Sequence, residues 1–194
     1  MIERSPLRDA AIRAMLPVAA EQGWTWSTIR AGLAGIGEDP ALAESHFPTG
    51  PAGVVEAWMD LADREMTSAA AAEDLAALRV PQRIRRLIEL RLLAVAPHKR
   101  ALRRAFAVLA LPWNLSRSFA SSARTMDAIW RAAGDASADF SWYTRRATLA
   151  GIYWATLAWW MRNDDPGVTD AMAFLDRRLA DLGRVRRPRG QPAG

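Results

Sequence analysis

The 194-residue sequence contains no cysteine and only two histidines, His46 and His98. The lack of cysteine excludes disulfide bonds, thiolate metal sites and thiol nucleophiles, and two histidines leave little for metal binding or acid–base catalysis. Neither histidine has a carboxylate three residues before it, so the Glu-x-x-His pattern of di-iron helical bundles is missing. These absences predict a protein that is not an enzyme, with no catalytic residues and no metal site.

Long apolar runs are also missing. A membrane-spanning helix needs about 18 or more consecutive apolar residues, and stretches such as Phe106–Trp113 are interrupted by proline or flanked by arginine. The first residues, Met1–Arg8, lack the basic start, apolar middle and small-residue cleavage site of a secretory signal. We therefore expect a cytoplasmic protein that does not cross a bilayer.

Lysine is nearly absent, with Lys99 the only one, so arginine carries most of the positive charge behind the net charge of +5. Basic residues are concentrated between Arg79 and Arg104, where Glu89 is the only acid, and again in a Pro- and Gly-rich tail that we expect to be disordered. A solvated outer helix face is the usual explanation of such a cluster. The alternative is peripheral contact with an anionic membrane, to which each basic residue near the surface contributes roughly 1 kcal/mol.

No segment of any length has the pattern of a β-strand. Prolines fall where helices would start, and apolar residues recur every three to four positions between them. This pattern predicts an all-α fold of eight or nine helices around one core. The expected helices cover about 6–23, 27–36, 40–46 and 54–66, then two that begin at Pro81 and Pro97, then about 115–134, 139–162 and 165–182.

The N-terminal part of the chain resembles the DNA-binding head of TetR repressors, because three short helices with glycine breaks precede an aromatic turn at His46–Phe47. A recognition helix needs Arg, Lys, Asn or Gln at base edges and basic neighbours for phosphates. The candidate helix, Pro40–Ser45, has neither, and three acidic residues within 38–44 would repel a phosphate backbone. We therefore expect this scaffold to have lost its DNA-reading surface, so that DNA is an improbable partner.

The segment Thr125–Tyr153 is unusually rich in Trp, Tyr, Asp and Arg for a helix pair, and it reads TMDAIWRAAGDASADFSWYTRRATLAGIY. This segment resembles the signature of the Coq-nine family of ubiquinone-biosynthesis accessory proteins. The matching positions are Asp127, Trp130, Ala133, Gly134, Asp135, Ser137, Asp139, Trp142, Tyr143, Thr144, Arg145, Arg146, Leu149, Ala150, Gly151 and Tyr153. The sequence departs from the family at Ala138, where the family usually has threonine.

The resemblance implies a TetR-like fold that performs no chemistry itself. In the family, the C-terminal bundle holds a lipid, an isoprenoid quinone intermediate, and the protein assists the di-iron demethoxyubiquinone hydroxylase. By analogy with repressors of this scaffold, helices 139–162 and 165–182 would form a homodimer interface. The expected parts are a vestigial helix-turn-helix head over 1–66, a helical lipid-binding bundle over 67–183 and a disordered basic tail over 184–194.

One set of candidate residues would bind the partner protein. The family implicates its Trp-Tyr pair in docking the hydroxylase, and this pair corresponds to Trp142 and Tyr143. The two side chains leave a helix about 100° apart, so both cannot point into a core unless the helix is buried all round. The alternative is that both are ordinary packing residues at the edge of the core. The other members are Asp127 and Asp139, as weaker neighbours, and Arg145 and Arg146, as a polar rim.

A second set would bind the lipid. It lies on the inward stripes of three consecutive helices, which together can enclose an elongated apolar tail or, equally, form a solid core. Its members are Phe106, Leu109, Trp113, Ile129, Trp130, Leu149, Tyr153 and Leu157. Two other functions stay open: a TetR-type ligand-sensing repressor, which would bind its own upstream DNA in a salt-dependent way, and a structural interaction module without a ligand.

Overall fold

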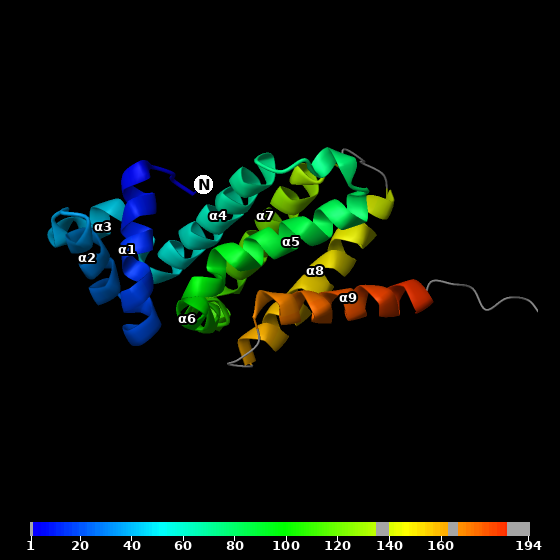
Figure 1. Cartoon of the computed structure of the whole chain (residues 1–194). Coiled ribbons are helices and arrows are strands. Elements are labelled where there is room, and N and C mark those ends of the chain that lie inside the picture. Colours follow the sequence, from blue (N-terminus) through cyan, green and yellow to red (C-terminus); the bar gives the residue numbers. More distant parts are fainter. Residues whose placement is uncertain (1, 135–139, 163–166, 186–194) are drawn as a thin grey trace, which may run out of the picture. The chain divides into compact units, whose positions relative to one another are not determined.

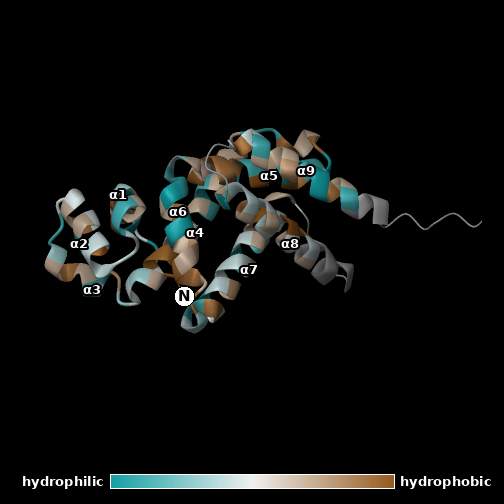
Figure 2. Ribbon diagram, turned by 90° about the horizontal axis from the view of Figure 1, so that it is seen from below, coloured by the Kyte–Doolittle hydropathy of each residue, from teal (hydrophilic) through white to brown (hydrophobic). Residues whose placement is uncertain are grey.

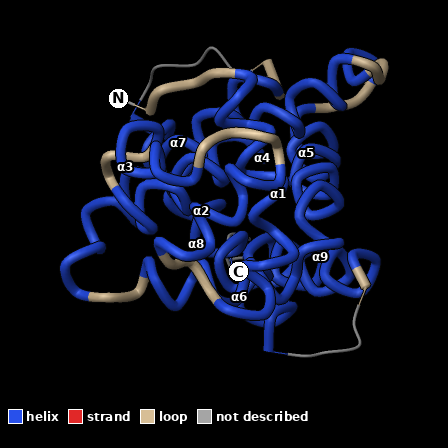
Figure 3. Tube along the Cα trace, turned by 90° about the vertical axis from the view of Figure 1, so that its left-hand side faces the viewer, coloured by secondary structure: helices blue, strands red, loops and turns tan. Residues whose placement is uncertain are grey.

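A computed structural model describes residues 2–134, 140–162 and 167–185, with side chains for all of these except 140–146 and 182–185. Within these ranges every regular element is helical and none is a strand, as Figure 3 shows in blue. The predicted all-α class is therefore confirmed. By their contacts the residues form two compact units, Met1–Ala136 and Ser137–Gly194, called unit 1 and unit 2 below.

Unit 1 contains seven described α-helices and four short 3-10 helices (Figure 1). The α-helices are α1 (Pro6–Gln22), α2 (Trp26–Gly35), α3 (Ala43–His46), α4 (Gly50–Ala71), α5 (Val80–Val95), α6 (Lys99–Leu109) and α7 (Leu115–Ala132). The 3-10 helices are η1 (Pro40–Leu42), η2 (Leu75–Ala77), η3 (Ala96–His98) and η4 (Pro112–Asn114). These bounds follow most of the expected helices to within a few residues.

Local signals explain where the first helices begin and end. The Ser5 hydroxyl accepts a 3.2 Å hydrogen bond from the backbone N–H of Arg8, and the Thr25 hydroxyl accepts one of the same length from Thr28. Both residues are N-caps that satisfy amide groups left free at a helix start. Gly23 adopts a φ of 82°, in the left-handed region that favours glycine, and this conformation stops α1.

The fourth helix is longer than expected. The apolar spacing predicts a helix over about 54–66, whereas α4 runs from Gly50 to Ala71. Pro51 fits the first turn because no intrahelical N–H bond is needed there, and the alanines at the far end favour continuation of the helix. The expected division at residue 66 therefore falls inside a continuous helix, and the functional parts assigned to either side remain predictions.

Two groups of contacts hold unit 1 together: α1 packs on α2 and α6, and α4 packs on α5 and α7. Figure 2 shows the two-sided character of these helices as brown and teal segments that alternate along the ribbons. Trp24 links the groups, because its ring centroid lies 5.3 Å from that of Trp58 on α4 and its indole N–H donates to the carbonyl of Ala101 on α6 at 3.1 Å. The N-terminal helices are therefore anchored on the bundle.

The described residues of unit 2 form two helices, α8 (Phe140–Arg162) and α9 (Val168–Val185), which pack on each other. The ring of Trp159 on α8 stacks on Phe174 of α9 with centroids 5.1 Å apart. The starts expected at Asp139 and Asp165 lie outside the described residues. The helix α9 continues through Val185, into the segment expected to be a disordered tail, and the tail beyond it is not described.

No helix in the ranges that the structure describes is long and apolar enough to cross a bilayer.

Candidate functional site

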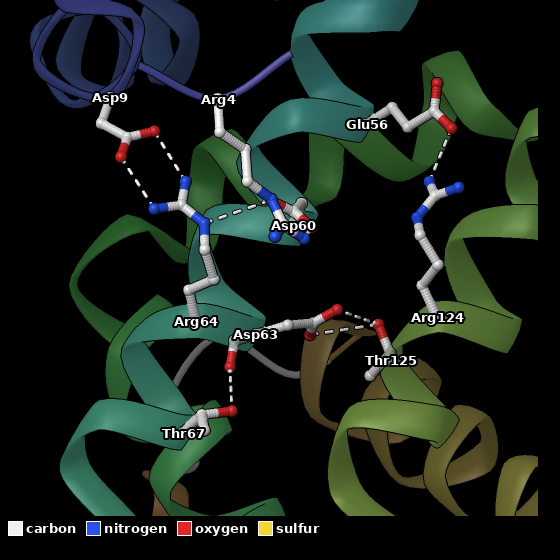
Figure 4. Close-up of polar contacts among 9 residues, drawn as sticks. All are labelled: Arg4, Asp9, Glu56, Asp60, Asp63, Arg64, Thr67, Arg124 and Thr125. Atoms are coloured by element: carbon white, nitrogen blue, oxygen red, sulfur yellow. Dashed lines mark hydrogen bonds and ion pairs between the residues drawn. The ribbon is translucent and has the colours of Figure 1, made fainter. Parts of the chain in front are cut away.

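A polar interior region of unit 1 lies along one face of α4. Glu56, Asp60 and Asp63 follow one another at spacings of four and three residues, which places their carboxylates on the same side of the helix. Figure 4 shows this side turned toward α1 and α7. Asp60 and Asp63 are 6% and 5% exposed, so each needs a partner that compensates for the loss of water.

Asp60 ties the N-terminal segment to α4. It accepts hydrogen bonds from Arg4 at 2.6 and 2.9 Å and from Arg64, one turn further along α4, at 3.1 Å. Arg64 in turn donates both of its terminal nitrogens to Asp9 on α1 at 2.7 and 2.8 Å. The hydrogen bonds to Asp9 raise the pKa of Arg64, and the hydrogen bond to Asp60 raises that of Arg4. These hydrogen bonds and ion pairs fix α1 and the N-terminal segment against α4.

Asp63 links α4 to α5 and α7. Arg91 of α5 donates to it at 2.6 Å, and the hydroxyl of Thr125 of α7 donates at 2.9 Å. Arg91 and Thr125 are each 2% exposed. The expectation that the arginines of 79–104 form a solvated outer face is therefore wrong for Arg91, because the buried carboxylate of α4 draws its guanidinium inward.

Other arginines of that basic segment are also engaged within unit 1. Arg86 binds Glu73 at 2.6 and 2.8 Å, and Arg104 donates to the backbone carbonyls of Ala20 and Glu21 at 3.0 and 2.8 Å. These contacts use the basic side chains to hold loops and helix ends. Arg79, Arg100 and Arg104 are nevertheless exposed, so the expected solvated face is formed by part of the segment only.

Two pockets open beside the acidic row of α4, and Arg124 of α7 lines both. One has a volume of about 350 Å³ and the other of about 370 Å³. Glu56 lines the first pocket, where it accepts hydrogen bonds from Arg117 at 3.1 Å and from Arg124 at 2.6 Å. Their charged lining suits a polar group, and the carboxylates beside them are already paired with arginine. In the described residues no cluster of His, Asp or Glu is arranged to hold a metal ion.

The predicted lipid-binding residues divide between the two units. In unit 1, Leu109, Ile129 and Trp130 are buried and Phe106 is half-buried. In unit 2, three predicted lipid-binding side chains of α8 are buried: Leu149, Tyr153 and Leu157. An inward position is therefore confirmed for most of the set, and lipid binding by these residues stays a prediction.

Trp113 is the exception, because its side chain is 75% exposed. It lies in the 3-10 turn between α6 and α7, where the periodicity of neither helix applies. Asn114 takes the inward position instead, is 6% exposed and donates from its side chain to the carbonyl of Val108 at 2.9 Å. The inward orientation predicted for Trp113 was therefore wrong.

Two further apolar residues of this region are exposed. Leu115 and Phe119 of α7 are 45% and 74% exposed. The small residues Ser121 and Thr125 occupy the buried stripe of α7 in their place, with Thr125 bound to Asp63. The spacing of apolar residues alone does not reveal this exposed patch, because polar residues occupy buried positions of α7.

The predicted partner-binding residues are only partly described. Asp127 is half-buried on α7. The backbone of Trp142, Tyr143, Arg145 and Arg146 belongs to α8, but their side chains lie outside the described residues, as does all of Asp139. Their docking role stays a prediction.

Comparison with solved structures identifies the class of fold. The chain superposes on the TetR transcriptional regulator from Nitrosomonas europaea ATCC 19718 with a TM-score of 0.74, at 23% sequence identity, over 93% of this chain and 99% of the regulator. The protein thus has the all-helical fold of TetR regulators. At this level of identity, the likeness establishes the fold alone.

Sequence comparison identifies the family. Residues 115–186 match the COQ9 family model. The chain is 32% identical over 185 residues to "Ubiquinone biosynthesis protein COQ9, mitochondrial" of Rattus norvegicus and 31% identical over 182 residues to the Homo sapiens protein of the same name, in each case over 90% of this chain. Residues 115–186 of the chain are therefore a COQ9 family domain, in agreement with the Coq-nine resemblance of the signature segment. The chain spans 57–58% of the length of these two relatives.

Proposed function

We propose that this protein is a non-enzymatic accessory factor of ubiquinone biosynthesis, which binds an isoprenoid quinone intermediate and presents it to the demethoxyubiquinone hydroxylase. The observation that carries the proposal is the COQ9 match over residues 115–186, which takes in α7, α8 and α9. The relatives named for ubiquinone biosynthesis match most of this chain, which supports the same pathway here.

The proposed lipid contacts are apolar. In unit 1 they are Phe106, Leu109, Ile129 and Trp130, and in unit 2 they are Leu149, Tyr153 and Leu157. Buried aliphatic and aromatic side chains bind an isoprenoid tail through its apolar surface and need no charged partner. The polar pockets beside α4 are lined by other residues, so the proposal does not place the tail in them.

Extraction of the purified protein with organic solvent, followed by mass spectrometry, tests the lipid. We expect an isoprenoid quinone or precursor in near-stoichiometric amount, well above that in an unrelated helical protein of the same size purified in parallel. If no lipid exceeds that background, quinone binding is wrong and the proposed function loses its main part.

A pair of matched variants makes the assay specific. Leu109→Ala removes a predicted lipid contact, and Leu33→Ala removes a side chain of the same size from the core of α1 and α2, where no lipid contact is predicted. Leu109 is 3% exposed and Leu33 is 0% exposed, so both changes leave a cavity of similar size. We expect co-purified lipid to fall for Leu109→Ala alone. Equal lipid in the two variants would remove Leu109 from the site.

The fold supports one alternative function, that of a ligand-sensing repressor. The segment that would read DNA, Pro40–Ser45, forms the 3-10 helix η1 and the start of the four-residue helix α3, where Glu44 is exposed. A carboxylate at this place opposes contact with phosphates. Salt-dependent binding to the DNA upstream of the protein's own gene would favour the repressor, and lack of binding at low salt would exclude it.

A further part of the proposal concerns assembly. Repressors of this fold class pair through their last two helices, so α8 and α9 are the proposed homodimer interface. Light scattering of the purified protein gives its mass directly. A monomer at micromolar concentration would contradict this part while leaving lipid binding untouched.

A further inference from the structure

The first of the two pockets beside α4, here named the arginine pocket, has a chemically distinctive lining. The N-terminal segment, α1, the first turn of α4 and the first half of α7 all contribute residues to it. Three of these residues are arginines, namely Arg8, Arg117 and Arg124, and two are acids, namely Glu3 and Glu56. Its volume of about 350 Å³ is enough for a small organic molecule.

Arg8 of α1 is a buried cation in the wall of this pocket. It is 7% exposed, and its guanidinium lies over the ring of Phe47 at 4.7 Å from the centroid. Its Nη1 donates to Glu3 at 3.1 Å and to the backbone carbonyl of His46, whereas the buried Nε has no acceptor among the residues that the structure describes. A guanidinium has five N–H donors, so Arg8 is held in a fixed place and keeps donors for another acceptor.

The α7 side of the pocket holds two arginines that share one carboxylate. Arg117 donates to one oxygen of Glu56 at 3.1 Å, and Arg124 donates to the other at 2.6 Å, as Figure 4 shows for Arg124. The two arginine side chains are 38% and 36% exposed, whereas that of Glu56 is 13% exposed. The guanidinium groups are therefore accessible to a ligand while their carboxylate partner stays in the wall.

The charges that line the pocket are not balanced, since three arginines face two carboxylates. The neighbouring charges do not correct this, because Arg4 and Arg64 are paired with Asp9 and Asp60. The first turn of α4 adds partial positive charge through its free N–H groups, and its N-cap, Thr49, makes no side-chain cap. One singly charged anion would balance the pocket.

Glu3 indicates which kind of anion fits. Its side chain is 73% exposed and reaches Arg8 from the N-terminal segment, so one donor of the pocket already binds a carboxylate oxygen. An ion pair with so exposed a partner contributes little free energy and is readily exchanged. Glu3 can therefore give way to the carboxylate of a ligand.

We propose that the arginine pocket binds the carboxylate of a small organic molecule, with its three arginines as the cations and Glu3 as an internal competitor. Guanidinium groups bind carboxylates through paired, charge-assisted hydrogen bonds. A doubly charged phosphate fits less well, because Glu56 remains in the wall and repels it. The apolar lining residues, which are Ile2, Pro48 and Ala120, contact the body of the molecule.

Titration of the full chain with sodium benzoate, followed by proton–nitrogen NMR, tests the proposal. Benzoate is a suitable probe because it carries one carboxylate on a small apolar body. We expect saturable shifts of the Arg8 Nε–H and of the Gly53 amide, weaker binding of inorganic phosphate, and no saturable shift with benzamide, which lacks the charge. Absence of saturable shifts with benzoate, equal binding of benzamide, or tighter binding of phosphate would overturn the proposal.

Glu3→Gln tests the competitor role with a gain of affinity. Benzoate should bind about threefold more tightly, because a carboxylate that occupies Arg8 is removed. Glu21→Gln is the control, since it removes the carboxylate of another exposed pair, Arg100–Glu21, and makes the same change in net charge. Weaker binding by the Glu3 variant, or an equal gain in the control, would contradict the competitor role.

Arg117→Gln tests the cations. This change spares the contact of Arg8 with the His46 carbonyl and leaves Glu56 paired with Arg124, so the fold is retained. Benzoate should bind about tenfold more weakly, because a charge-assisted hydrogen bond is lost. Arg13→Gln is the control, since Arg13 forms an exposed pair with Glu65 and does not line the pocket. Equal affinity in these two variants would overturn the site.

Co-purified lipid, measured on Arg117→Gln, separates this inference from the proposed function. The quinone content should be unchanged, because no proposed tail contact lines the arginine pocket. Loss of quinone together with unchanged benzoate affinity would place Arg117 in the lipid site and overturn the carboxylate site.

Discussion

Arg91 of α5 donates a 2.6 Å hydrogen bond to Asp63 of α4, and the two side chains are only 2% and 5% exposed. Thr125 of α7 completes the group by donating to the same carboxylate. Three helices of unit 1 are therefore joined by one buried ion pair and one hydroxyl hydrogen bond. Moving such a pair out of water costs free energy, but removing one partner costs much more, because the other charge then stays buried and unpaired.

Arg91→Leu should destabilise the protein by about 3–5 kcal/mol, because Asp63 then remains buried without its cation. Urea unfolding measures the loss. Arg100→Leu is the control, since the Arg100–Glu21 pair is about two-thirds exposed and such pairs contribute about 1 kcal/mol or less. If the two variants lose similar stability, the buried pair is not specially important.

Gly32→Ala should destabilise the contact between α1 and α2. A Cβ at this position would lie 2.3 Å from Cγ of Met15 and 2.9 Å from the backbone carbonyl oxygen of Ala11, and the backbone cannot yield as a side chain can. We expect a loss of roughly 1–3 kcal/mol. Gly35→Ala on the same helix is the control, because its nearest neighbour would be 3.4 Å away. A Gly32→Ala protein as stable as the control would show that the two helices separate easily.

His98 should stay neutral at a lower pH than an ordinary histidine. Burial lowers its pKa from the usual 6.5, and the nearby carboxylate of Glu65 opposes this shift. Because the folded form binds its proton less readily than the unfolded chain, the stability that depends on neutral His98 is complete above pH 6.5 and declines as the pH falls below that value. Histidine proton resonances followed against pH by NMR measure the pKa directly.

Glu65→Gln tests the direction in which Glu65 shifts the pKa of His98. Loss of the carboxylate should lower the pKa of His98 further, because a nearby acidic charge that favours its protonated form is removed. Glu44→Gln, on α3, makes the same change in net charge and serves as the control. A rise in the pKa of His98 in the Glu65 variant would contradict the assignment.

The helices of this protein could be predicted from sequence because their signals are local. Ser5 and Thr25 act as N-caps within three residues of the amides they bind, and Gly23 and Gly134 stop helices through their own positive φ angles. Even there, α4 extends past its apolar stripe, since alanine favours a helix without needing a partner.

The candidate site was less predictable because it depends on neighbours distant in sequence. By its sequence pattern Arg91 is expected to face outward. Only the tertiary structure places Asp63, 28 positions earlier in the chain, beside it. Trp113 and Phe119 have the composition of core residues, and only the tertiary structure shows that Asn114 and Ser121 hold the inward positions. The docking role of Trp142 came from family resemblance rather than from physical pattern, and it requires its own test.

Trp142→Ala should weaken binding to purified demethoxyubiquinone hydroxylase by about tenfold or more, the usual effect of removing a tryptophan from the centre of an interface, while the melting temperature stays nearly unchanged. Trp159→Ala is the matched control on the same helix. Its ring stacks on Phe174 of α9, so this change should lower the melting temperature and leave hydroxylase affinity intact. A large fall in melting temperature with unaltered affinity in the Trp142 variant would place that residue in the core. It would then leave Tyr143 as the member of the pair to test for docking, since adjacent positions on a helix point about 100° apart.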